Sequence, residues 1–273
     1  MPYPQYPYGV PGIFNNFDDT GSSLYNSLQT TLEKRYSTGL SFLVSYTLSR
    51  MMSNTNSGFT SFGATAYNKN NQASEWTIDN NDQTNLISIL ATYELPIGKG
   101  KPLLGNHGVV SNVVGGWVLS PVLTYSTGTP LWSGTGGTVY GPGDPLGNNC
   151  APCNRVDVVP GVTQEFSYSN VYKGLPVLNA AAFTAPGVWT LGTEPRVLPL
   201  RYPWNLNENL SLSKNFAIAE RITAQLRFSY FNLFNRVVFG SPDLGLADPT
   251  FGMVINSQAN TQRQGQAQFT LRF

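Results

Sequence analysis

Few residues of this chain have types and spacing that could do chemistry. Cys150 and Cys153 form a CAPC motif in a Gly/Pro-rich segment, and His107 is the single histidine. A CxxC pair far from any strand–helix–strand pattern favours a small loop disulfide, with free thiols, redox chemistry and metal binding as the alternatives. One such pair is weak evidence for zinc, which normally takes four ligands. We expect His107 to be a surface turn residue.

Two pairs of carboxylates could in principle act as general acid and base. They are Asp18 with Asp19 and Asp79 with Asp82. In Asn/Asp-rich segments such side chains are more often solvated turn formers, which is what we predict for them. The sequence has no nucleophile elbow, phosphate loop or dinucleotide fingerprint. We therefore predict that the chain is not an enzyme and uses no cofactor or metal.

The composition narrows the class of protein. Of the 273 residues, 41% are hydrophobic and 12% aromatic, which is enough apolar material to fold. Charged residues make up only 11%, against about 25% in an ordinary soluble domain. The formal charge is +1, and no basic stripe could neutralise a row of phosphates, so we expect no nucleic-acid partner. This balance suits a sheet with one face in lipid.

Apolar residues recur with a period of two in several segments, the pattern of a strand with unlike faces. Asn205, Asn207 and Asn209, for example, alternate with Leu206 and Leu210. A strand of about 9–11 residues can cross a bilayer. The sequence predicts seven strands, at 23–36, 40–52, 85–97, 113–127, 205–216, 221–236 and 264–273.

The links between these strands alternate between short and long. The short links are 37–39, 98–112 and 217–220, and the long ones are 53–84, 128–204 and 237–262. Outer-membrane barrels have short periplasmic turns and long extracellular loops. The pattern predicts an all-β, antiparallel transmembrane barrel segment over 23–273, preceded by a loop segment at 1–22. Seven strands make only a partial barrel, because such barrels usually have an even strand count.

A soluble β-sandwich would show a similar alternation of apolar and polar residues. The predicted strands are longer than the roughly 5–6 residues that are typical of soluble proteins. Structureless loops beyond about 12–15 residues are also uncommon in compact domains. Both observations favour the membrane barrel and a location in the outer membrane.

The segments together resemble the C-terminal barrel portion of TonB-dependent receptors, specifically the Oar-like group with a carboxypeptidase-regulatory-like N-terminal domain. The order and spacing of the segments carry the likeness, which covers nearly the whole chain. The segments are NSLQTTLEKRYSTGLSFLVSYTLSR at 26–50, NNDQTNLISILATYELPIGKGK at 80–101, GGWVLSPVLTYSTGTPL at 115–131, FNLFNR at 231–236 and QFTLRF at 268–273.

This resemblance implies a receptor whose barrel has about 22 strands, of which this chain would supply about a third. It implies uptake of a small substrate such as a siderophore, carbohydrate or peptide. Its partners would be outer-membrane lipid, an N-terminal plug, the TonB system and the barrel-assembly machinery. By the same resemblance, Phe269, Leu271 and Phe273 would be the C-terminal signal that this machinery reads.

Other interpretations stay open from the sequence. The N-terminus, MPYPQYPYGVPG, lacks a secretory signal, so the chain is either not exported or a fragment that begins upstream. A small adhesin-like outer-membrane protein and a secreted carbohydrate-binding β-domain are alternative functions. The aromatic residues of 128–204 could contact a ligand or, as we expect, pack the loop against itself. They are Trp132, Tyr140, Tyr168, Tyr172, Trp189, Tyr202 and Trp204.

Overall fold

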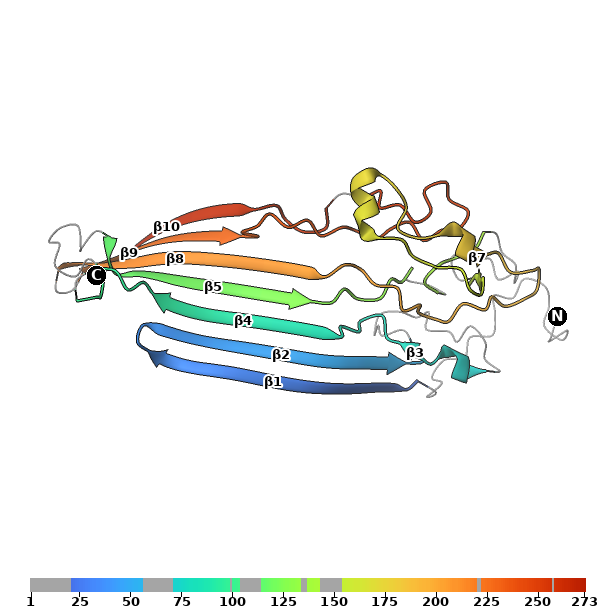
Figure 1. The fold of residues 1–273 in the computed structure, drawn as a ribbon, viewed down its shortest axis with the longest axis horizontal. Helices are drawn as coiled ribbons and strands as arrows, with labels where there is room; N and C mark the ends of the chain where they lie inside the picture. The colour runs from blue at the N-terminus through green and yellow to red at the C-terminus, as the bar shows by residue number, and fades with distance from the viewer. Residues whose placement is uncertain are drawn as a thin grey trace.

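The fold is dominated by one long antiparallel sheet (Figure 1). In this computed structural model, the described residues are 21–55, 71–98, 100–103, 114–133, 137–142, 154–219, 222–256 and 258–273. The seven long strands lie side by side in chain order, and every neighbouring pair is antiparallel. They are β1 (Ser23–Ser37), β2 (Leu40–Ser53), β4 (Asn85–Glu94), β5 (Trp117–Ser126), β8 (Asn205–Ala219), β9 (Ile222–Phe231) and β10 (Gln264–Arg272).

These are the seven strands that the period-two pattern predicts, so the predicted fold class is confirmed. The sheet does not close, because β1 and β10 form its two edges in the described part of the chain. Each short link joins neighbouring strands at one end of the sheet, and the long links gather at the other end (Figure 1).

Some strand boundaries differ from those expected, each for a local backbone reason. β4 ends at Glu94, because Pro96 has no N–H for a ladder bond. β5 begins only after Gly116, which has φ 73°. β9 ends at Phe231 because Asn232 takes the left-handed conformation at φ 50°, which Asn tolerates better than most residues. The β1–β2 turn has positive φ at both central residues, Thr38 and Gly39, as a tight hairpin requires.

Smaller elements lie within the long links. β3 (Thr77–Ile78) pairs with the end of β2, and β6 (Asp157–Val158) pairs with β7 (Phe183–Thr184). The described helices are the short 3-10 turns η1 (Gln72–Glu75), η3 (Tyr168–Lys173) and η4 (Ala180–Ala182). None of the helices in these described ranges has the length and hydropathy that a membrane crossing requires.

Strand register gives the sheet two unlike faces. Leu212 pairs with Leu119 on one side and Phe228 on the other, whereas the adjacent Ser211 pairs with Ser120 and Ser229. The apolar face carries, among others, Leu28, Leu32, Val44, Tyr46, Ile87, Ile89, Leu119, Leu123, Leu210, Leu212, Leu226, Phe228 and Phe269. The polar face carries Gln29, Ser45, Thr47, Ser88, Thr92, Ser120, Thr124, Asn209, Ser211, Gln225, Ser229, Gln266 and Gln268.

No large apolar side chain of the long strands is buried by protein. Leu28, Leu32 and Phe269 are 61%, 60% and 67% exposed. The one buried hydrophobic residue of these strands is Ala224, and the other buried ones are polar or charged: Ser49, Ser53, Ser126, Glu208 and Lys214. A soluble sandwich would pack a second sheet on the apolar face, and in the described residues no such layer does so. The apolar face therefore needs lipid to cover it.

We predict that Leu212→Arg lowers the amount of protein inserted in the outer membrane and its midpoint of unfolding in urea. An Arg on the lipid face near the bilayer midplane costs about 2–4 kcal/mol. The matched control is Ser211→Arg, because its side chain lies one residue away on the polar face. Equal losses from both substitutions, measured by fractionation and heat-modified gel mobility, would contradict the assignment of the faces.

Candidate functional site: the loop cap

The long links fold into one packed unit at one end of the sheet, which we call the loop cap. It comprises the described residues of 71–84, 128–204 and 237–262. Its hydrophobic core consists of Leu131, Val139, Val156, Val177, Leu178, Ala182, Phe183, Leu198, Leu200, Leu244 and Phe251. Phe183 and Phe251, from different links, meet edge to face with ring centroids 5.9 Å apart. The cap is thus a folded scaffold of the kind on which binding sites are usually built.

The cap is fixed to the polar face of β2 by buried ionic groups. Arg196 donates from Nη2 to the carbonyl oxygen of Ser53 at 2.8 Å and to its hydroxyl at 2.7 Å. The same hydroxyl donates to Asp79 at 2.6 Å, and Ser49 donates to the carbonyl of Gln83 at 2.7 Å. Both serine side chains point from the polar face. The cap therefore packs over the loop end of that face.

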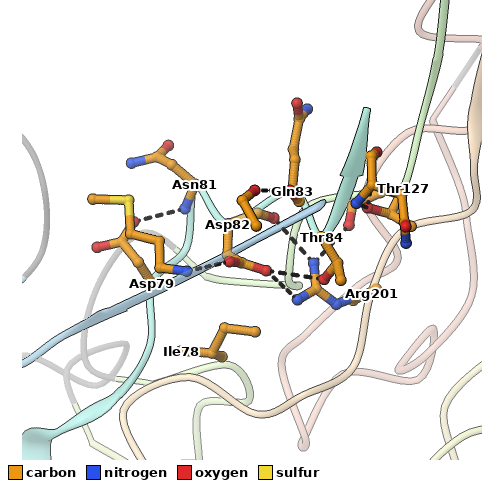
Figure 2. A network of polar contacts seen from close by, with 12 residues as sticks. Ile78, Asp79, Asn81, Asp82, Gln83, Thr84, Thr127 and Arg201 are labelled. Carbon is orange, nitrogen blue, oxygen red and sulfur yellow. Dashed lines mark hydrogen bonds and ion pairs between the residues drawn. The ribbon is translucent and has the colours of Figure 1, made fainter. Parts of the chain in front are cut away.

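A second contact joins the link after β2 to the long link after β5 (Figure 2). Arg201 pairs with the carboxylate of Asp82 and also donates to the carbonyl oxygens of Asp82 and Gly128, each at 3.0 Å. The other oxygen of this carboxylate accepts from the backbone N–H of Met51 at 2.5 Å. Asp82 thus holds two links and a strand together.

This geometry corrects one prediction. Asp79 and Asp82 are not solvated turn formers, since both are buried, at 0% and 1% exposure. Asp79 does keep one turn-type contact, because it accepts from the backbone N–H of Asn81 at 2.8 Å. Arg side chains and backbone N–H groups around these two carboxylates offset the free-energy cost of removing them from water.

A third contact lies deeper in the cap. Arg155 donates from Nη2 to Glu75 at 2.5 Å, with both side chains at most 4% exposed. Arg196 also donates to the backbone oxygen of Glu75 at 3.2 Å. Removing either member of the pair would leave a buried charge without its counter-ion.

Glu194 differs from the other buried carboxylates of the cap in its hydrogen bonding and its pKa. One oxygen accepts from the backbone N–H of Val139 at 2.9 Å, and the other has no hydrogen-bond partner among the described residues. Burial raises its pKa to about 8, against the smaller opposing influence of that N–H and of Arg155. A neutral Glu194 leaves three carboxylates, of Glu75, Asp79 and Asp82, to balance Arg155, Arg196 and Arg201.

The buried ionic residues link parts of the fold through ion pairs and hydrogen bonds to the backbone. Within the described ranges, no group of three or more His, Cys, Asp and Glu side chains is placed to hold a metal ion. The candidates Cys150, Cys153, His107, Asp18 and Asp19 lie outside the described residues. Phe269, Leu271 and Phe273 are exposed at and beyond β10, and their role as an assembly signal stays a prediction.

The aromatic residues of 128–204 divide into two groups. Tyr140, Tyr168 and Tyr202 pack against the cap core, as expected for rings that fold the loop on itself. Trp132 is partly buried. Tyr172, Trp189 and Trp204 are instead 75%, 76% and 49% exposed. The first group builds the cap, and the second is displayed on its surface.

Trp189 is displayed on a strained turn. The N–H of Thr190 and its hydroxyl both donate to the carbonyl of Gly187, at 3.1 and 2.5 Å, which closes a tight turn. Trp189 takes φ 62°, a conformation that costs a bulky residue about 1–3 kcal/mol. Such strain at an exposed side chain points to a function for that side chain.

Sequence reasoning missed Glu75, Arg155, Glu194, Arg196 and Arg201. Each is a charged residue in a long link between strands, and no local pattern distinguishes it from a solvated one. The one usable signal is composition, because ionic residues are scarce in this chain and several fall in long loops.

Comparison with known families gives one match. A family model described as outer membrane beta barrel domain matches residues 1–266. No curated protein and no solved structure matches the chain.

We predict that Arg155→Met loosens the cap, because it leaves Glu75 buried without its counter-ion, at a cost of about 3–5 kcal/mol. Limited proteolysis of the protein in outer-membrane vesicles should show faster cleavage within the cap. The control is Arg263→Met, since Arg263 is exposed at the same end of the sheet. Unchanged cleavage in the Arg155 variant would show that the pair does not stabilise the cap.

A second prediction concerns pH. The pKa of Glu194 is raised from 4.5 to about 8 in the folded cap. The folded state therefore holds a proton that the unfolded state releases, so the contribution of Glu194 to cap stability is greatest below pH 4.5 and falls as pH rises towards 8. Glu194→Gln should flatten this dependence in the same proteolysis assay. Glu165→Gln, at an exposed position, should not. An unaltered pH slope in the Glu194 variant would contradict the prediction.

Proposed function

Because the chain belongs to the outer membrane beta barrel domain family, and is therefore an outer-membrane protein, we propose that it forms wall of a TonB-dependent receptor that takes up a small substrate. In this proposal the seven strands are the C-terminal run of a larger barrel. The barrel holds a plug, is energised by the TonB system, and is inserted by the barrel-assembly machinery. No catalytic step is involved.

The open sheet is the observation that carries the proposal. β1 has 15 residues and β10 has nine, and each pairs on one side only in the described structure. An unpaired strand edge in hydrocarbon leaves its N–H and C=O groups without partners, at several kcal/mol each. In this proposal, further strands pair with β1 and β10 and complete the wall. Outer-membrane transporters of about 22 strands enclose a plugged lumen. Seven strands would be about a third of such a barrel.

Two further features support a receptor over a small structural barrel. The polar face carries hydroxyl and amide side chains, which suit contact with water or a plug inside a wide barrel. The loop cap is a packed scaffold that stands over the loop end of that face. A small adhesin-like barrel would have to close from these strands, and β1 and β10 are not paired with each other.

The size of the native protein tests the proposal. We predict that an antiserum raised against this chain detects, in boiled outer-membrane fractions, a band of roughly three times 29.8 kDa. Deletion of the gene provides the control and should remove the band. A band at 29.8 kDa alone would overturn the receptor proposal and favour a small outer-membrane protein.

A further inference from the structure

A guanidinium group lies at the loop end of the apolar face. Glu208 of β8 belongs to this face, because it pairs in register with Leu123 of β5. Arg236, which follows β9, donates from Nη2 to Oε1 of Glu208 at 3.2 Å. The Glu208 side chain is 2% exposed and that of Arg236 is 46% exposed. The charged end of Arg236 therefore lies beside the face that needs lipid to cover it, and it reaches the surface there.

The turn after β9 holds the backbone of Arg236 in place. The side chain of Asn232 accepts from the N–H of Arg236 at 2.6 Å and donates to its carbonyl oxygen at 2.8 Å. Asn260 donates to the same carbonyl oxygen at 2.9 Å. The guanidinium lies over the ring of Phe234, 5.5 Å from its centroid, and this residue is 62% exposed. The turn thus places a cation on an exposed aromatic ring at the rim of the apolar face.

The guanidinium of Arg236 has donors to spare. Such a group carries five N–H donors, and Nη2 is the one atom of this group that has a partner in the described part of the chain. The second oxygen of Glu208, Oε2, has no hydrogen-bond partner among these residues either. A phosphate accepts two parallel hydrogen bonds from one guanidinium, so the remaining donors of Arg236 suit this group.

Two further arginines lie at the same rim. Arg50 is exposed on the apolar side of β2, towards its loop end. Arg263 is exposed and directly precedes β10, at a position that continues the apolar side of this strand. Its backbone N–H donates to Oδ1 of Asn235 at 3.0 Å, in the turn that holds Arg236. In the described part of this rim, three arginines thus stand against the single carboxylate of Glu208, so the rim attracts anions.

We infer that this rim binds the phosphate groups of anionic lipid in the outer leaflet, with Arg236 and Arg263 as the contact residues. A lipid is favoured over a soluble anion because the rim is continuous with the lipid-covered face. The rings of Tyr230 and Phe234, 47% and 62% exposed, also lie there, and aromatic side chains favour the depth of the headgroups. The inference does not depend on the receptor proposal, since any barrel that contains these strands has the same rim.

The test uses the full native protein, purified from outer membranes in detergent, and native mass spectrometry to measure bound lipid. The probes are diphosphorylated lipid A, the same lipid A after removal of its phosphates, and inorganic phosphate. We expect the phosphorylated lipid A to bind at least about tenfold more tightly than the dephosphorylated form. An equal concentration of inorganic phosphate should not displace it. Equal binding of the two lipid A forms, or displacement by inorganic phosphate, would overturn the inference.

Substitutions separate lipid binding by Arg236 from its structural role. Arg236→Gln is combined with Glu208→Gln, so that no buried carboxylate loses its counter-ion. This double variant should bind phosphorylated lipid A about tenfold more weakly, and adding Arg263→Gln should weaken binding further. The matched control is Arg227→Gln, because Arg227 is an exposed arginine of β9 on the polar face. Heat-modified gel mobility checks that each variant is folded. Equal affinities of the folded double variant and the control would exclude Arg236 from a lipid site.

Discussion

The structure depends on one constraint, which is that its main sheet has an apolar face and no protein layer to cover it. In water such a sheet would expose Leu28, Leu32 and Phe269 on its edge strands and leave the apolar residues of its central strands only partly covered. In a bilayer the same residues are at the correct interface, and the backbone ladder satisfies the polar groups that lipid cannot. Membership of an outer membrane barrel family agrees with this physical reading. The length of the strands, the scarcity of charged residues and the difference between the two faces are all requirements of a sheet that spans a lipid bilayer.

The loop cap obeys the opposite rule, because it contains the cluster of buried apolar side chains that the sheet lacks. Six of its ionic residues lie at low exposure and are held by counter-charges and backbone groups; they are Glu75, Asp79, Asp82, Arg155, Glu194 and Arg196. The contacts of Arg196 with Ser53 and of Asp82 with the backbone N–H of Met51 fix the position of the cap relative to β2. Buried pairs of this kind contribute little net stability when complete, but they disfavour other arrangements of the loops because any break leaves a charge unpaired.

The sheet could be predicted from the sequence because the alternation of apolar and polar residues along a strand is a local property of the sequence. Sequence reasoning predicted the ends of strands less accurately where a single residue ends the strand, as Pro96 does after β4 and the left-handed Asn232 does after β9. It treated Asp79 and Asp82 as solvated, because their partners lie far away in the chain and leave no local trace. The exposed Trp189 could not be distinguished from the packed Tyr168, since ring exposure in a loop is set by tertiary packing. The roles of Cys150, Cys153 and Phe273 stay predictions.

The ionic contacts of the cap also bear on how the protein assembles. Glu75 and Arg155 are 80 residues apart in the chain, and Ser53 and Arg196 are 143 apart. The β1–β2 hairpin, in contrast, is joined by the two residues Thr38 and Gly39. Contacts between distant residues carry a larger loop-closure entropy and form more slowly. The hairpins can therefore pair early, whereas the cap can close only after β2 and the later strands stand in register, which makes its closure a late step of maturation.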